Sequence, residues 1–124
     1  MRGIMLVALG GAAGAAARYV IGGWLADRVG SSFPWHTFAI NVSGAFLIGL
    51  VLALSLDRAA IGADWRLFLT TGVLGGYTTF STLSYETVVL AREGAWAAAT
   101  GNMLGSAVAG VVAVLAGLAL GRVL

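Results

Sequence analysis

Residues 75–84 read GGYTTFSTLS and place two glycines and five serine or threonine hydroxyls in ten positions. This segment stands inside an apolar run that is long enough to cross a membrane. A glycine pair followed by threonines weakens a helix, and lipid cannot satisfy the backbone carbonyls that are freed at this depth. Irregular backbone is expected there only where protein or a water-filled path surrounds it. We therefore expect a helix broken at mid-membrane and an ion site beside the break.

The apolar runs around this segment indicate an integral membrane protein. Of 124 residues, 60% are hydrophobic and 10% are charged, against about 45–50% and about 25% in soluble domains. Each of four runs reaches the roughly 17–25 residues that a helix needs to cross the hydrocarbon core. We expect an all-α membrane protein with one integral membrane domain, residues 1–124. Its four helices are placed at about residues 3–26, 35–56, 66–90 and 95–121, the third broken near its middle.

Several classes of protein are excluded by what the chain lacks. Cysteine is absent and there is a single histidine, which excludes disulfides and thiolate metal sites and argues against a histidine-based one. All seven basic residues are arginines, spread over loops and termini, so we expect no nucleic-acid partner. The connections are too short to hold a soluble domain, and we expect no enzyme activity. The apolar N-terminus is interpreted as a retained helix, because Arg18 falls where a signal peptide needs a small cleavage motif.

The arginines divide between the two ends of an alternating bundle. Arg2, Arg58, Arg66 and Arg122 would lie at the end that holds the termini, and Arg28 and Arg92 at the other. Arg18 joins the second group if its side chain snorkels that way. A bias of about four against two or three is too weak to fix one orientation by the positive-inside rule. We therefore expect insertion in both orientations and an antiparallel, dual-topology homodimer.

Small residues recur on one stripe of the first and of the last helix. In the first helix, a residue of the stripe recurs every four positions: Gly10, Gly14, Arg18 and Gly22. The last helix has a similar stripe, which consists of Asn102, Ser106, Gly110, Gly117 and Gly121. Such stripes let helices approach closely, either within one bundle or between subunits. Arg18 is the exception in its stripe, because an arginine inside a span either faces a vestibule or snorkels to the interface. The sequence is compatible with both positions of the Arg18 side chain.

The second helix places Thr37, Asn41 and Gly44 on one face. An amide in a span offers two donors and an acceptor, so Asn41 either bonds a neighbouring helix or serves an ion. His36 follows Trp35 and Pro34 at the expected membrane surface, where we interpret it as an interfacial anchor rather than a proton relay.

The third helix is the densest in polar groups. Its serines and threonines surround Phe80, and Glu86 follows one turn after Thr82. Hydroxyls that bond back to their own helix explain one or two such residues, but five within seven positions exceed that need. Together with Asn41 they supply a row of hydrogen-bond donors. The edge of the Phe80 ring, which carries the positive part of the ring quadrupole, adds to this row. The pattern indicates an anion path.

Three segments resemble the signature segments of the Fluc (CrcB) fluoride-channel family. They read GGAAGAAARY (residues 10–19), HTFAINVSGAFLIG (residues 36–49) and GVLGGYTTFSTLSYE (residues 72–86). The resemblance covers the whole chain, and the last segment is close to diagnostic. It implies a dual-topology homodimer in the plasma (inner) membrane of a bacterium, which lets cytoplasmic fluoride leak out passively through two pores.

The resemblance also implies roles for individual residues. The backbone carbonyls of Gly75 and Thr78 from both subunits would hold a structural Na⁺ at the dimer centre, as suits a hard cation. Each fluoride pathway would be lined by Asn41, Phe80, Ser81, Thr82, Leu83, Glu86 and Ser106, with Arg18 in a vestibule. A tight row of donors would replace the water of this small, strongly hydrated anion.

Two positions depart from the family pattern. Leu83 stands where the family usually has a second phenylalanine. One of the two aromatic rings that would contact the anion is therefore missing, and we expect an altered or reduced fluoride flux. In the last helix, relatives often have a tyrosine near the asparagine, whereas this chain reads GNML at residues 101–104. We expect Ser106 to provide the polar contribution of that helix to the fluoride pathway.

Two other classes of membrane protein fit the sequence less well than the channel. A small multidrug exporter also has four spans, but its proton exchange needs a carboxylate in the first span, where this chain has Arg18 and no acid. A structural subunit of a larger membrane complex would explain glycine stripes but not the concentrated hydroxyls and Asn41.

Overall fold

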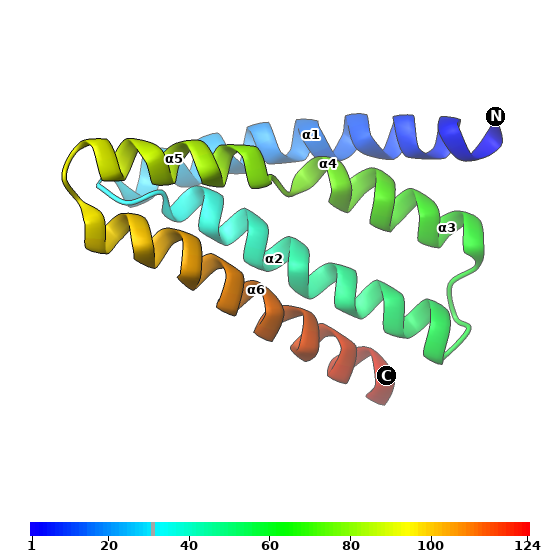
Figure 1. Ribbon diagram of the computed structural model, residues 1–124. Coiled ribbons are helices and arrows are strands. Elements are labelled where there is room, and N and C mark those ends of the chain that lie inside the picture. The colour runs from blue at the N-terminus through cyan, green and yellow to red at the C-terminus, as the bar shows by residue number, and fades with distance from the viewer. Residues whose placement is uncertain (31) are drawn as a thin grey trace.

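The computed structural model describes residues 1–30 and 32–124, and this part of the chain is helical with no strand. Its elements are α1 (Arg2–Val29), α2 (Trp35–Leu52), η1 (Ala53–Asp57), α3 (Ala63–Leu67), η2 (Phe68–Leu74), α4 (Gly75–Tyr77), α5 (Phe80–Arg92) and α6 (Trp96–Val123), where η marks π-helical segments. Contiguous elements join into four passes: α1, α2 with η1, the run from α3 to α5, and α6 (Figure 1). The predicted all-helical protein with four passes is confirmed.

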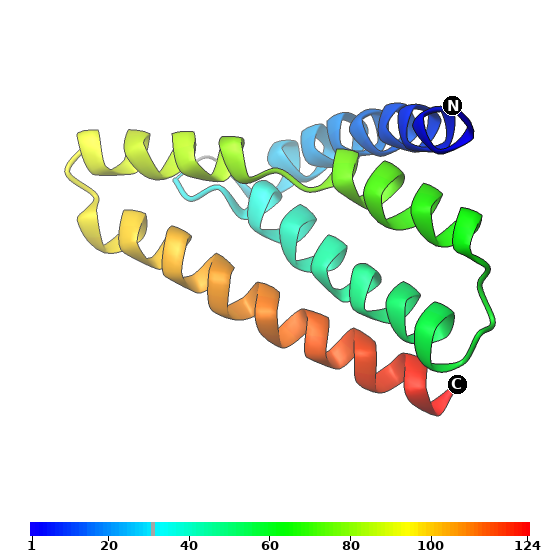
Figure 2. The same ribbon diagram turned by 45° about the vertical axis from the view of Figure 1, so that its right-hand side comes forward.

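Three of the four passes are long and apolar enough to cross a membrane as single helices. They are Arg2–Val29, Trp35–Asp57 and Trp96–Val123. The third pass differs because it is interrupted: α4 ends at Tyr77, and α5 has only 13 residues, short of the roughly 17 that a crossing helix needs. The irregular link between its halves is visible in Figure 2. The break falls inside the segment where the sequence predicts it.

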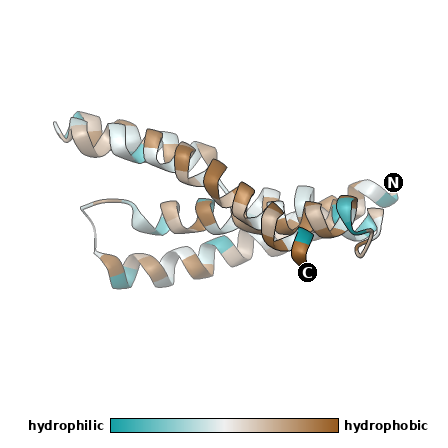
Figure 3. Ribbon diagram, turned by 90° about the horizontal axis from the view of Figure 1, so that it is seen from below, coloured by the Kyte–Doolittle hydropathy of each residue, from teal (hydrophilic) through white to brown (hydrophobic). Residues whose placement is uncertain are grey.

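The polar ends of the bundle follow the predicted alternation. Both termini and the connection from η1 to α3 lie at one end, and the connections α1–α2 and α5–α6 lie at the other (Figure 1). At the first end, Arg2 forms an ion pair with Asp64, and Arg122 Nε lies 2.8 Å from Asp57 Oδ2. Between these ends the helices are mostly apolar, as the colours in Figure 3 show.

Glycines allow the helices to meet backbone to backbone. A Cβ on Gly14 of α1 would overlap the carbonyl oxygen of Val73 in η2, and a Cβ on Gly117 of α6 would overlap that of Phe46 in α2. The stripe on α1 therefore packs against its own chain, and most of the stripe on α6 does the same. Gly110 is the exception among the glycines of the α6 stripe, since a Cβ there meets no atom within 4 Å.

The outward faces of the helices are apolar and exposed. On α6, Leu104, Val108, Val111 and Leu115 each keep about three fifths of their surface accessible. A contiguous face of this kind is compatible with lipid or with a second copy of the chain.

Candidate functional site

The backbone leaves the helix at two successive threonines. Thr78 (φ −81°, ψ 157°) and Thr79 (φ −149°, ψ 117°) are extended, and α5 begins at Phe80. The side-chain amide of Asn41, on α2, forms hydrogen bonds with both backbone polar groups of Thr79. Asn41 Nδ2 donates to the Thr79 carbonyl at 3.0 Å, and the Thr79 N–H donates to Asn41 Oδ1 at 2.8 Å. One side chain thus provides the hydrogen bonds that a neighbouring strand would otherwise supply.

This pairing redirects the donors that a continuous helix would have used. In an α-helix, the Thr79 N–H would donate to the Gly75 carbonyl and the Thr82 N–H to the Thr78 carbonyl. Here the first donates to Asn41, and the second donates to Thr79 Oγ1 at 3.3 Å. The carbonyls of Gly75 and Thr78, which are named as cation ligands from the sequence, are therefore among those that lose their helical donors at the break.

Arg18 also contacts the break. Its Nε donates to the Gly76 carbonyl at 3.1 Å, across from α1. The bond involves Nε and not the two terminal guanidinium nitrogens of Arg18, and the residue also lines a cavity of about 170 Å³. Sequence reasoning placed Arg18 in a vestibule but missed the bond to Gly76, because the spacing of a stripe does not show which turn of the next helix it meets.

The hydroxyls at the break fall into two groups. Thr78 Oγ1 bonds back to the Leu74 carbonyl at 2.9 Å, which is the ordinary use of a threonine in a helix. Thr79 Oγ1 instead caps α5 and lies within hydrogen-bond distance of both Ser81 Oγ (3.3 Å) and Thr82 Oγ1 (3.2 Å). Three hydroxyls thus cluster at the N-terminus of α5, where the helix dipole favours negative charge.

A cavity of about 390 Å³ joins several of the predicted pathway residues. Asn41, Phe80, Leu83 and Ser106 all line it, so residues of α2, α5 and α6 meet there. Phe80 is 73% exposed, whereas Leu83 is buried at 7%. The aromatic edge is accessible beside a residue that has no ring of its own.

Arg18 and Thr82 line a second, smaller cavity of about 170 Å³. Thr79 borders both cavities, so the break itself stands between them. Ser81 lines neither cavity and is exposed on the outer surface of α5. Apart from Glu86, the predicted pathway residues therefore divide over two cavities and one outer face of this chain.

Glu86 lies beyond the second cavity and contacts two residues of α2. The Thr37 hydroxyl donates to Glu86 Oε1 at 2.5 Å, and His36 Nε2 lies 3.7 Å from Glu86 Oε2. Thr37 is a contact that sequence reasoning missed, because its position one turn before Asn41 shows the face that it shares with Asn41 but not the residue that it meets. Glu86 is thus held against α2 instead of facing open solvent.

α6 contributes two buried polar side chains one turn apart. Asn102 is fully buried, and its Nδ2 donates to Thr87 Oγ1 at 3.0 Å, while Thr87 bonds back to the Leu83 carbonyl at 2.8 Å. Within residues 1–30 and 32–124, Asn102 Oδ1 and Ser106 Oγ have no hydrogen-bond partner. Ser106 lines the larger of the two cavities, so its hydroxyl can serve a polar species there.

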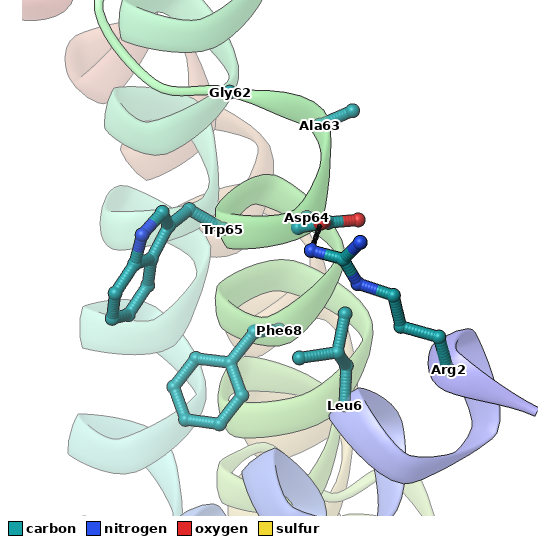
Figure 4. Close-up of a pocket in the computed structure, with 7 residues that line it drawn as sticks. All are labelled: Arg2, Leu6, Gly62, Ala63, Asp64, Trp65 and Phe68. Carbon is teal, nitrogen blue, oxygen red and sulfur yellow. Dashed lines mark ion pairs between the residues drawn. The ribbon is translucent and has the colours of Figure 1, made fainter.

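A third, larger pocket contains none of these residues. It has about 620 Å³ and lies at the end that holds the N-terminus, between α1 and α3. Figure 4 shows its lining: Leu6, Trp65 and Phe68 are apolar, and Arg2 is paired with Asp64. Because its charges neutralise each other, it offers no free ionic group to a ligand.

Side-chain metal ligands do not gather in the part of the chain that the structure describes. No three histidine or carboxylate side chains there could share a metal ion. A cation site beside the break would therefore draw on backbone carbonyls and hydroxyl oxygens.

Comparison with known proteins gives a consistent result. Residues 5–118 match the family described as "CrcB-like protein, Camphor Resistance (CrcB)". Proteins named "Fluoride-specific ion channel FluC" from Chloroflexus aurantiacus and Agrobacterium fabrum are each 48% identical over 122 residues. The match covers 98% of this chain in both cases, and 97% and 98% of the two relatives. A protein of the same name from Thermus thermophilus is 48% identical over 120 residues, which are 97% of this chain and 94% of that protein.

Proposed function

Because this chain belongs to the CrcB family, we propose that it is a fluoride-selective channel through which cytoplasmic fluoride leaves a bacterial cell by passive electrodiffusion. The observation that carries the proposal is the broken third pass. Its extended threonines, capped by Asn41, expose hydroxyls and a helix N-terminus at the depth where a bilayer has its lowest polarity. We further propose the inner membrane as its location.

The anion path is proposed to use the donors around the two cavities. Asn41 uses one Nδ2 hydrogen for Thr79 and has a second available for an ion. Ser81 and Thr82 add hydroxyls, and the exposed edge of Phe80 adds a weak positive potential. Arg18 supplies the fixed positive charge of the vestibule. Fluoride exchanges its hydration shell for these groups and keeps its charge, so no chemistry is required of the protein.

Two copies in antiparallel orientation are proposed to form the working unit. The weak arginine bias between the two ends supports insertion both ways. The accessible Phe80 ring and the exposed Ser81 support a pathway that is completed by a second subunit, because neither is enclosed by its own chain. Each antiparallel dimer would then contain two equivalent pores.

A structural Na⁺ at the dimer centre fits the donor set. The carbonyls of Gly75 and Thr78 have lost their helical donors to Asn41 and Thr79, which leaves hard oxygen ligands of the kind that this cation prefers. When bound, the ion would supply positive charge that holds two broken helices together. The chain's own contribution is the hydrogen bonding that keeps these carbonyls out of the helix.

Reconstitution in liposomes tests the proposal. Vesicles that contain the purified protein and are loaded with fluoride should release it to a fluoride electrode once a counter-ion path is opened. Vesicles loaded with chloride should stay full. If fluoride is retained while cross-linking shows an intact dimer, the proposed function is wrong. Transport of a cationic drug driven by a proton gradient, with fluoride retained, would instead indicate an exporter.

A further inference from the structure

The chain's single histidine faces Glu86 and not only the membrane surface. His36 is the second residue of α2, and its side chain is 33% exposed. Its Nε2 lies 3.7 Å from Glu86 Oε2, while Glu86 Oε1 accepts the 2.5 Å bond from Thr37. The Glu86 side chain is 17% exposed. The interfacial anchor expected from the sequence thus has an ionisable partner inside the bundle.

His36 stands between two cavities. On one side it lines the 170 Å³ cavity with Arg18 and Thr82. On the other it lines a cavity of about 340 Å³ with Glu86 and Glu93, next to the connection between α1 and α2. An ion that moves from the break toward this end of the bundle would pass the His36–Glu86 pair.

The ionisable groups around His36 come from three places. α1 contributes Arg18, α5 contributes Tyr85 and Glu86, and Glu93 follows directly after α5. Among the described residues that line these two cavities, no other side chain is ionisable. With His36 neutral and Tyr85 protonated, one arginine faces two ionised glutamates, and the local balance is one negative charge. Protonation of His36 removes that excess.

We infer that His36 is a proton-binding residue that sets the charge at one end of the fluoride path. When it is protonated it pairs with Glu86, and fluoride meets a neutral pair in place of a carboxylate. When it is neutral, Glu86 repels the anion. Histidine is the side chain that ordinarily changes charge between about pH 5 and pH 8. The inference rests on the proposed function, because it concerns the rate at which fluoride passes.

Fluoride current across a planar bilayer is the measurement, with equal fluoride and equal pH on both sides. Current counts ions alone, so neutral hydrogen fluoride that crosses the lipid does not contribute. We expect the current of the unaltered protein to rise about two- to fivefold from about pH 8 to about pH 5.5, as local repulsion of the anion is relieved. The expected gain in current is modest, because protonation changes the charge of His36 alone and the side chains of Arg18 and Glu93 still border the path.

Two substitutions of the same residue bracket the effect. His36→Gln keeps a polar side chain that does not titrate, so its current should stay at the high-pH level throughout. His36→Arg carries a fixed positive charge, so its current should stay at the low-pH level. Elution as an intact dimer on size exclusion checks the fold, and either variant alone tests the inference if the other fails to assemble.

The outcomes separate the role of His36 from the proposed channel function. A pH-independent current in the unaltered protein overturns the role of His36 and leaves the channel proposal standing. A slope that persists in His36→Gln does the same and assigns the titration to Glu86 or another group. Absence of fluoride current at every pH overturns the proposed function and, with it, this inference.

Discussion

The contact between α2 and α6 and the junction between α4 and α5 are held together in opposite ways. α2 and α6 meet through glycines, with Gly117 lying against the Phe46 carbonyl so closely that no Cβ fits. The α4–α5 junction is instead held by side-chain hydrogen bonds, with Asn41 and Arg18 satisfying backbone groups of Thr79 and Gly76. The first contact depends on shape and the second on polar pairing, so different substitutions should disrupt them.

Gly117→Ala should give the largest loss of stability. The added methyl would overlap the Phe46 carbonyl and lie 2.8 Å from the Leu50 backbone nitrogen. We expect the free energy of unfolding to fall by about 2–3 kcal/mol, as for other overpacked sites. Unfolding in a denaturing-detergent titration, followed by circular dichroism, measures it.

Gly110→Ala is the matched control for that experiment. It makes the same change on the same helix, where a Cβ meets nothing within 4 Å. It should be neutral or stabilise by up to about 1 kcal/mol, because alanine favours helix over glycine. Equal losses in both variants would show that close approach is not what holds α2 to α6.

Asn41→Ala should disrupt the junction and leave the glycine contact intact. It removes both partners of Thr79, and each unsatisfied buried group costs about 1–3 kcal/mol. We expect a loss of about 2 kcal/mol and a fall in fluoride flux of about 100-fold, because the break and one anion donor change together. Liposome efflux and the same unfolding titration are the measurements.

Ser43→Ala provides the comparison for Asn41, since Ser43 lies two residues further along α2 and is exposed. It should keep both stability and flux within about twofold of the unaltered protein. If Asn41→Ala keeps full flux, the amide pairing is not needed to hold the path open.

Some of the features compared here could be predicted from the sequence, and others could not. The four apolar passes and the break follow from composition and from GGYTT, because each depends on local preference and on length. The pairing of Asn41 with Thr79 and of Glu86 with Thr37 could not be predicted. Those contacts depend on how far one helix is shifted along another, and a helical period fixes only which face a residue occupies. The π-helical form of η2, which packs against α1, was also missed.

Arg18 should show an intermediate effect that separates charge from geometry. Arg18→Gln removes the positive charge, and we expect flux to fall by about tenfold. Arg18→Lys retains the charge but loses the planar guanidinium whose Nε reaches the Gly76 carbonyl, so flux should fall by about threefold. Equal flux in the two variants would indicate that the bond to Gly76, and not the charge, is what the path requires. Fluoride efflux from liposomes at low and high ionic strength measures both.

Leu83→Phe should have a small effect and, unlike the other pathway substitutions, should raise the flux. Leu83 borders the 390 Å³ cavity beside the exposed Phe80 ring, so a larger side chain has space to enter. A second ring edge would add favourable potential for an anion, which leucine lacks because it has no quadrupole. We expect the flux to increase about two- to fivefold. Leu83→Met is the control, because it nearly conserves volume without adding a ring and should leave the flux unchanged. If Leu83→Phe conducts no faster than the unaltered protein, the donors of Asn41, Ser81 and Thr82 suffice for the path without an aromatic pair.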